Sequence, residues 1–331
     1  MKAAYIEQTG PPENIIYGDL PRPEPSGSQV LVKVRAVAVN PVDTYIRNGA
    51  KYWELPKPFI VGCDLAGVVE QAGPDAQQFQ PGDRVWCTNQ GLMGRQGTFA
   101  EYCAVDACWL NPTPDGVADE TAAACALVGV TAHLGLFRDA RLRSKETVFV
   151  HGGTGGVGAM VVQMAKAAGA RVIATGGSPE KVARCQELGA DLAINYQTQD
   201  VAAEVKAFAP QGVNVVWETL REPDFDQLVG LLAERGRLIL MAGRDARPPF
   251  PVGPFYVKNC SLHGVVMFKA SPEELRNCAD EMNRWLAERR LQAQIGATLP
   301  LSQTAMAHRM QEENTLGKKG TLAGKIVLRP D

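Results

Sequence analysis

The stretch His151-Gly152-Gly153-Thr154-Gly155-Gly156-Val157-Gly158 decides the fold of this chain. Residues 146–150, which are largely β-branched or aromatic, come before it and predict a buried strand. Residues 159–168, which are apolar and rich in helix formers, follow it and end at a glycine. Gly153, Gly155 and Gly158 therefore form a G-x-G-x-x-G pattern between a strand and a helix, the setting in which this pattern binds a dinucleotide.

The glycine turn has two properties that a pyrophosphate requires. Glycine permits unusual backbone angles and lets the main chain come close to the phosphates. The N-terminus of the following helix adds unpaired N–H groups and the positive end of the helix dipole. We therefore assign residues 153–158 to the binding of a dinucleotide cofactor.

Beyond the glycine turn, predicted strands alternate with predicted helices. This alternation is typical of a parallel sheet covered on both faces, a doubly wound α/β domain. Ligands of such sheets bind at the carboxyl ends of the strands, which places Thr175–Gly177, Glu218–Thr219 and Ala242–Gly243 beside the cofactor. The further predicted strands are residues 171–175, 192–194, 213–217 and 237–241.

The two ends of the chain have a different pattern. Short β-rich runs broken by Gly and Pro fill residues 1–119 and predict a compact, mostly antiparallel β-domain. In the tail we expect a strand at Val265–Phe268, a helix at 272–290 and a last strand that returns to the first domain. We therefore predict one domain of residues 1–120 and 265–331, interrupted by a dinucleotide-binding domain of residues 121–264.

Composition narrows the class of protein. The 331 residues are 45% hydrophobic and 21% charged, with a formal net charge of −2, which gives no electrostatic reason to expect a nucleic acid or a membrane as partner. We find no apolar run of 18 residues and no signal peptide at the strand-like N-terminus. The eight cysteines include no C-x-x-C pair and are typical of reduced thiols in a cytoplasmic protein.

The end of the second predicted strand indicates which cofactor binds. NAD-dependent domains carry an acid there that holds the ribose hydroxyls. This chain has Thr175-Gly176-Gly177-Ser178 instead, with Lys181 on the next helix and Tyr196 after the third strand. An uncharged strand end beside a cation suits a 2′-phosphate, so we expect NADPH, held by Gly176, Ser178, Lys181 and Tyr196. Alternatively, Lys181 is a solvated residue of a surface helix.

Five segments carry a resemblance to a known family. They are Asn40–Gly49, Gly62–Val69, Leu127–Ala132, His151–Gly158, and Gly189–Asp191 with Ile194–Tyr196. The chain resembles the medium-chain dehydrogenase/reductase superfamily and, within it, the zeta-crystallin-like quinone oxidoreductases. The resemblance implies a GroES-like β-domain interrupted by a Rossmann domain, NADPH as cofactor, a quinone or enone as substrate, and a homodimer or homotetramer.

Two departures from the family pattern leave the identity of the substrate open. Cys63 stands where the family more often has Ser, Thr or His. Glu218-Thr219-Leu220 replaces a commoner Asp-Ser-Val.

The resemblance also raises the question of zinc. Alcohol dehydrogenases of the superfamily hold a catalytic zinc with a Cys, a His-Glu pair and a second Cys. The matching positions here are Asn40, Cys63-Asp64 and approximately Val128. One thiol cannot make a tetrahedral site alone, and the four closely spaced cysteines of a structural zinc lobe are absent from the sequence. We therefore expect no metal.

Without a Lewis acid, hydride transfer favours an acceptor whose product charge is delocalised, such as a quinone or an α,β-unsaturated carbonyl. The Asn40 amide and the Tyr45 hydroxyl are our candidates for donors to the carbonyl oxygen, with Tyr52 at the rim. We expect Thr131 to contact the nicotinamide-ribose region and Phe268 to pack beside the ring. The alternatives are structural: a turn before Pro41 for the asparagine, core packing for the first tyrosine and loop cover for the second.

Three functions fit these residues. We favour an NADPH:quinone reductase. The enzymatic alternative reduces the carbon–carbon double bond of an enone, haloacrylate or enoyl thioester, for which Tyr45 could supply the proton. The non-enzymatic alternative is an NADPH-binding crystallin-like or RNA-binding protein, for which the chain offers only the basic residues of 138–143 and 318–319. The sequence leaves open the physiological acceptor and the choice between dimer and tetramer.

Overall fold

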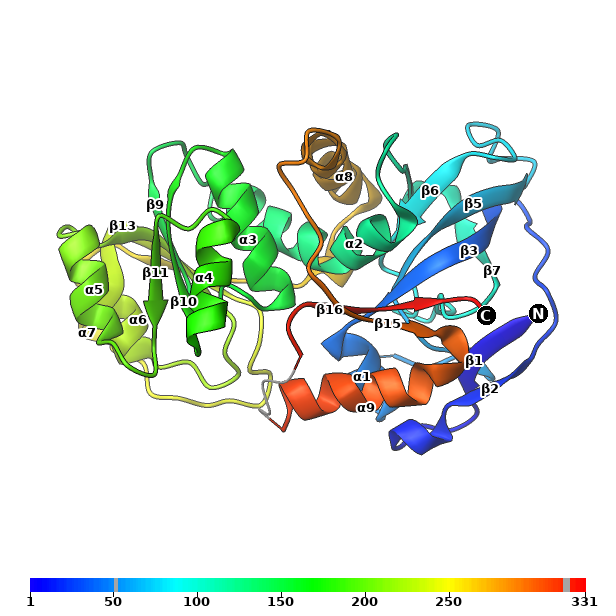
Figure 1. Ribbon diagram of the computed structural model, residues 1–331, viewed down its shortest axis with the longest axis horizontal. Coiled ribbons are helices and arrows are strands. Elements are labelled where there is room, and N and C mark those ends of the chain that lie inside the picture. The colour runs from blue at the N-terminus through cyan, green and yellow to red at the C-terminus, as the bar shows by residue number, and fades with distance from the viewer. Residues whose placement is uncertain (51–52, 318–321) are drawn as a thin grey trace. The chain divides into compact units, whose positions relative to one another are not determined.

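The protein is described by a computed structural model that covers residues 1–50, 53–317 and 322–331. Its contacts divide the chain into two compact units, one of Met1–Leu127 with Phe268–Asp331 and one of Val128–Met267. The first unit is built from both ends of the chain and the second from its middle, as the colours in Figure 1 show. The first division falls inside a helix, and the second lies between Met267 and Phe268.

The second unit, called the Rossmann unit below, contains a six-stranded sheet in which all strands are parallel. The order β11-β10-β9-β12-β13-β14 reverses between the first strand of the unit, β9, and the fourth, β12. The carboxyl ends of strands at such a reversal open a crevice for a ligand. The strands are β9 (Thr147–Val150), β10 (Arg171–Gly176), β11 (Leu192–Asn195), β12 (Val213–Glu218), β13 (Leu232–Leu240) and β14 (Ser261–Gly264).

Helices connect these strands, and their apolar faces pack on the sheet. Branched and aromatic strand residues such as Phe149, Ile173 and Val216 are fully buried in the resulting core. Ser178, Asp200 and Asp224 cap the N-termini of three helices with side-chain oxygens. The helices are α3 (Gly156–Ala167), α4 (Pro179–Glu187), α5 (Val201–Phe208), α6 (Phe225–Leu231) and α7 (Val252–Val257).

The expected strand at Val265–Phe268 is wrong. The strand is β14, four residues earlier, where Ser261–Gly264 pairs in parallel with β13. The pairing stops where β13 ends, with a last hydrogen bond from Val265 N to Leu240 O of 2.8 Å. Apolar character alone misled the prediction, because Val265 and Met267 are buried without belonging to a strand.

The first unit, called the β-unit below, contains two sheets. A seven-stranded sheet follows the path β15-β16-β3-β5-β6-β8 with β7 on β3, and a three-stranded sheet has the order β2-β1-β4. All pairs are antiparallel except β15 with β16. The strands are β1 (Lys2–Ile6), β2 (Ile16–Asp19), β3 (Gln29–Val39), β4 (Phe59–Ile60), β5 (Asp64–Ala72), β6 (Arg84–Cys87), β7 (Tyr102–Asp106), β8 (Leu110–Pro112), β15 (Ile295–Pro300) and β16 (Lys325–Arg329).

The pairing of β16 with β3 joins the end of the chain to a sheet that begins near its start, visible in Figure 1 as a red strand beside a blue one. The helices that accompany these sheets are α1 (Pro41–Arg47), α2 (Asp119–His133), α8 (Pro272–Ala287) and α9 (Thr304–Thr315). Short 3₁₀ turns lie at Pro12–Asn14, Ala107–Trp109, Met267–Lys269 and Leu301–Gln303, and a π-helical turn at Leu134–Asp139 continues α2.

One stretch of the chain meets the length and composition criteria for a membrane span. The stretch Asp119–Asp139 is long and apolar enough to cross a membrane by composition, although we found no such run in the sequence. However, 78% of its most apolar window is buried inside the protein, as in the core helix of a globular protein. It is the only such stretch among the residues that the structure describes.

Candidate active site

The glycine turn connects β9 to α3, and its glycines are required for different reasons. A Cβ on Gly158 would lie 2.1 Å from Gly152 O, and one on Gly153 would lie 2.7 Å from the Cβ of Ala174. These two glycines therefore let the turn pack against itself and against β10. A Cβ on Gly155 would meet only Gly152 O, at 3.5 Å. Packing within the chain does not explain this glycine, whereas the close approach of a ligand to the backbone does.

Hydrogen bonds hold the turn to β10. Gly152 N donates to Thr175 Oγ1 and Gly153 N donates to Thr175 O, both at 2.9 Å. Thr175 is fully buried, so this anchor is shielded from water. The N-terminus of α3, which begins at Gly156, is thereby held at the end of the sheet.

A histidine–glutamate pair spans the point where the strand order reverses. His151 follows β9 and Glu218 ends β12, and His151 Nδ1 lies 2.8 Å from Glu218 Oε2. Thr219 Oγ1 also donates to His151 O, at 2.6 Å. Glu218 is almost completely buried, so its contact with the imidazole fixes both strand ends. Sequence reasoning did not find this pair.

The structure brings together the four residues expected around a 2′-phosphate. Ser178 Oγ accepts from Lys181 N at 3.3 Å, and Tyr196 N donates to Gly176 O at 3.2 Å. The Tyr196 ring lies so close to Gly177 that a Cβ there would be 2.3 Å from the phenol oxygen. This arrangement offers a hydroxyl, a phenol and a cationic residue at the end of β10.

Sequence reasoning overlooked an acid in this region. Glu180 lies in the first turn of α4, where a hydrogen bond from the Ser178 hydroxyl helps to lower the pKa of its carboxyl. The Glu180 carboxylate therefore places a negative charge close to the residues expected to bind phosphate. Its position one residue after Pro179, at the start of a helix, was the available signal.

The remaining predicted cofactor residues are Thr131, Ala242 and Gly243 in the Rossmann unit and Phe268 in the β-unit. Thr131 is buried in α2. Ala242 lines a shallow hollow of about 390 Å³ beyond β13 and β14, and Gly243 has a φ of +79°. Phe268, in the β-unit, packs edge-on against Trp53 with ring centroids 5.6 Å apart. Sequence reasoning did not foresee this aromatic pair.

Asn40 joins β3 to α1 in the β-unit, and its amide is fully engaged. The side-chain nitrogen donates to Asp64 Oδ2 at 2.8 Å and to Ala38 O at 3.3 Å. The side-chain oxygen accepts from the Lys325 ammonium. Asn40 is fully buried and has no donor left for a substrate carbonyl, so the geometry does not support the contact that we expected from the sequence.

Asn40 belongs to a buried cluster of ionisable groups. Burial, together with the nearby charge of Asp64, raises the pKa of Asp43 to about 7, although hydrogen bonds with the Cys63 thiol and Asn40 N and the charge of Lys325 oppose the shift. Burial likewise raises the pKa values of Asp64 and the Cys63 thiol, and it lowers that of Lys325. Two carboxyl groups thus share one ammonium away from water.

The two predicted tyrosines have different outcomes. Tyr45 is half-buried on α1, two residues after Asp43 of the cluster. Tyr52 lies outside the described residues.

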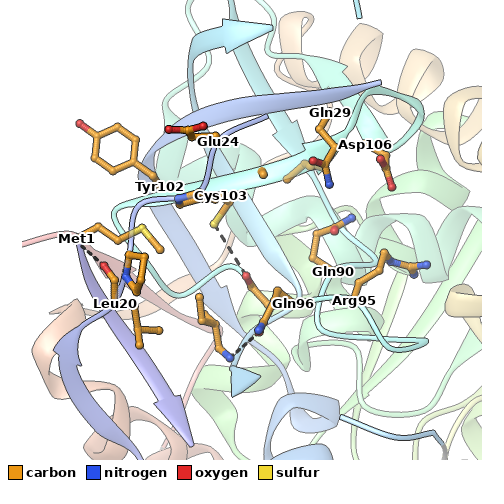
Figure 2. Close-up of a pocket in the computed structure, with 16 residues that line it drawn as sticks. Met1, Leu20, Glu24, Gln29, Gln90, Arg95, Gln96, Tyr102, Cys103 and Asp106 are labelled. Atoms are coloured by element: carbon orange, nitrogen blue, oxygen red, sulfur yellow. Dashed lines mark hydrogen bonds between the residues drawn. The ribbon is translucent and has the colours of Figure 1, made fainter. Parts of the chain in front are cut away.

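The cavity shown in Figure 2 has a volume of about 440 Å³ and lies in the β-unit. Gln90, Arg95 and Cys103 are among its lining residues, and no residue predicted for the site lines it. We therefore place the site by its chemistry and not by this cavity.

The donors at the positions that match zinc ligands do not fit zinc. Among the described residues, no group of three or more His, Cys, Asp or Glu side chains could hold a metal ion. Asn40 instead accepts a hydrogen bond from an ammonium, and zinc requires several deprotonated donors at one point.

Family models match both units. The alcohol dehydrogenase GroES-like domain matches residues 26–115, and the zinc-binding dehydrogenase domain matches residues 156–284. The quinone oxidoreductase of Rattus norvegicus is 32% identical over 99% of this chain and 97% of its own length. That of Pseudomonas aeruginosa is 31% identical over 92% and 93%. The chain belongs to the medium-chain dehydrogenase/reductase family.

Solved structures of this family agree with the fold. An NAD-dependent alcohol dehydrogenase is 31% identical with a TM-score of 0.90, and each chain covers 100% of the other. Mycobacterial Rv1454c complexed with NADPH is 31% identical with a TM-score of 0.85, again over 100% of both chains. The predicted GroES-like domain with a Rossmann domain is confirmed, as are the resemblance and the assignment to oxidoreductases. The structure of Rv1454c contains NADPH, in agreement with the cofactor expected from the sequence.

Proposed function

We propose that this protein is a zinc-independent reductase that transfers a hydride from NADPH to a quinone. The observation that carries the proposal is the hydrogen bond from the Lys325 ammonium to Asn40, because the resemblance matches Asn40 to a zinc ligand of the metal-dependent relatives. Without a metal to stabilise an alkoxide, the acceptor must delocalise its own product charge, as a quinone does. Full-length similarity to proteins named quinone oxidoreductase supports this substrate class.

The Rossmann unit would hold NADPH along the carboxyl ends of its strands. Bound NADPH supplies a hydride from nicotinamide C4. The backbone of Gly153–Gly158 and the N-terminus of α3 suit the pyrophosphate, and the open space at Gly155 supports this role. Ser178, Lys181 and Tyr196 suit the 2′-phosphate. Ala242, Gly243 and Thr131 complete the proposed contacts on this unit.

On the β-unit we assign the acceptor to Tyr45, with Phe268 beside the nicotinamide. Reduction of a quinone needs a proton as well as a hydride, and a tyrosine hydroxyl can donate a hydrogen bond or a proton to the carbonyl oxygen. Asn40 now has a supporting role, because its amide is used within the cluster. The edge-on packing of Phe268 on Trp53 would keep its ring in place.

The decisive experiment follows NADPH oxidation with 9,10-phenanthrenequinone and, in parallel, with an enone, before and after treatment with a chelator. We expect quinone turnover that survives the chelator. Loss of activity on chelation with recovery on added zinc would overturn zinc independence.

Turnover of the enone alone would favour the second candidate, an alkene reductase. The structure of a 2-haloacrylate reductase, 26% identical with a TM-score of 0.83 over 100% of both chains, supports this candidate. Tight NADPH binding without turnover of either acceptor would favour a binding protein.

We also propose a homo-oligomer in a reducing compartment such as the cytoplasm. Leu262 and Val266 are 42% and 38% exposed at the edge strand β14 and just beyond it, and an exposed apolar edge supports pairing with a second copy. All eight cysteines are free, which supports a reducing environment. Light scattering of the purified protein would give the number of subunits.

A further inference from the structure

Lys325 is the first residue of β16, and its side chain points into the core of the β-unit. Only 6% of this residue is exposed, which is unusual for a lysine. Its ammonium donates to Val39 O at 2.8 Å and to Asn40 Oδ1. A buried ammonium needs such partners because it has lost its hydration.

Several ionisable side chains surround this ammonium. Asp64 is linked to it through the Asn40 amide, and Asp43 Oδ2 accepts from Asn40 N at 2.7 Å. The thiols of Cys63 and Cys125 also lie within electrostatic range of Lys325, and burial keeps both protonated. All four side chains are at most 2% exposed. The cluster therefore contains two carboxyl groups and one cation, drawn from α1, the start of β5, α2 and β16.

The position of the Lys325 ammonium indicates the function of the cluster. Asn40 and Cys63-Asp64 match the positions that hold zinc in metal-dependent relatives, and here an ammonium from the end of the chain contacts Asn40. We propose that the Lys325 ammonium replaces the metal as the cation of this domain and acts as a positioning residue that fixes the start of α1, the helix that carries Tyr45. The inference rests on the proposed function, because it takes Tyr45 as the residue that contacts the acceptor.

The Lys325 ammonium supports the start of α1 through both its charge and its hydrogen bonds. Removal of the ammonium would take away a hydrogen-bond donor from the side-chain oxygen of Asn40 and from the backbone oxygen of Val39. It would also leave two buried carboxyl groups without a cation. Asn40 forms the N-cap of α1 and lies five residues before Tyr45, so a shift of its amide moves the helix start. A neutral side chain of the same length would fill the space but could not restore the charge.

The experiment compares Lys325→Met, Lys325→Arg and Lys325→Ala with a matched control, Lys258→Met. Lys258 also donates from its ammonium to backbone carbonyls, Val229 O and Leu232 O, but it lies in the Rossmann unit and has no part in the proposed site. We expect Lys325→Met to lower kcat/KM for the quinone about tenfold or more, as loss of a supporting contact commonly does. The Kd for NADPH should change less than about twofold, and Lys258→Met should lower the Tm without changing acceptor kinetics.

Chemical rescue separates a cation from a space-filling side chain. Propylammonium has the atoms that Lys325→Ala removes, and 1-propanol has a similar shape without the charge. We expect propylammonium to raise both the Tm and the quinone turnover of Lys325→Ala, and 1-propanol or sodium chloride to raise neither. If Lys325→Met does not fold, the rescue of Lys325→Ala and the kinetics of Lys325→Arg decide the question.

The inference is overturned if Lys325→Met keeps wild-type kcat/KM or if 1-propanol rescues Lys325→Ala as well as propylammonium does. Tyr45→Phe serves as the reference for a lost acceptor contact. If wild-type protein reduces neither quinone nor enone, or if Tyr45→Phe has wild-type kinetics, the proposed function fails. The rescue of Tm by propylammonium would then still report whether the domain needs a cation at this point.

Discussion

The glycine turn of the Rossmann unit and the Lys325 cluster of the β-unit are two ways to build a functional site. The turn is local: eight consecutive residues, His151–Gly158, present their backbone to a ligand. The cluster is dispersed: the contact between Lys325 and Asn40 joins residues 285 positions apart. A local site depends on backbone conformation, whereas a dispersed site depends on side chains that only the complete fold brings together.

This difference has consequences for mutation. In the turn, one glycine is required by the packing of the fold and another by the approach of the ligand. Substitutions at the two positions can therefore affect stability and cofactor binding separately. In the cluster, the ionisable side chains influence one another directly or through the Asn40 amide, so a change at one position alters the pKa values of the others. The predictions below test these two forms of organisation.

The largest expected effect separates two glycines of the same turn. Gly158→Ala should destabilise the protein by about 3 kcal/mol, because its Cβ would overlap Gly152 O and backbone atoms cannot easily move away. Gly155→Ala should change stability by less than about 0.5 kcal/mol but weaken NADPH binding about tenfold or more, because only the ligand needs that space. Urea unfolding and NADPH titration of both variants measure this. Equal loss of stability in both would show that the turn does not separate the two roles.

The second prediction concerns the cofactor phosphate. Lys181→Ala should weaken NADPH about 30-fold, or about 2 kcal/mol, while NADH changes less than about threefold, because only NADPH carries the 2′-phosphate. Titration of the variant and the wild type with both cofactors gives the ratio. Equal loss for the two cofactors would remove Lys181 from phosphate recognition.

The sequence predicted most of the Rossmann unit because its signals are local. A strand, a glycine turn and a helix in succession specify β9, the turn and α3, and the lack of an acid within Thr175–Ser178 pointed to NADPH. By contrast, a lysine at the start of the apolar run Ile326–Leu328 gave a weak signal. Nothing in the sequence shows that its ammonium reaches Asn40, because that contact depends on the pairing of β16 with β3.

The third prediction tests the charge of the cluster through pH. The folded state holds a proton on Asp43 up to about pH 7, whereas the unfolded chain loses it near the ordinary value of 3.8. Between these values the folded state binds more protons, so this residue makes the stability fall as the pH rises. Asp43→Asn should remove a fall on the order of 2 kcal/mol between pH 5 and pH 8.

Urea midpoints at the two pH values measure this slope in the wild type and in Asp43→Asn. Asp115→Asn, at an exposed position of the same unit, is the control and should keep the wild-type slope. An unchanged slope in Asp43→Asn would show that Asp43 does not hold the proton of the cluster.

The smallest expected effect returns to the end of β10. Glu180→Gln should strengthen NADPH about threefold, because it removes a negative charge near Ser178 and frees the serine hydroxyl for the phosphate. NADH affinity should not change, and the gain should shrink at high salt because the side chain is exposed. Weaker NADPH binding in this variant would mean that Glu180 supports the turn that presents Ser178, and the cofactor site would then depend on side chains as the Lys325 cluster does.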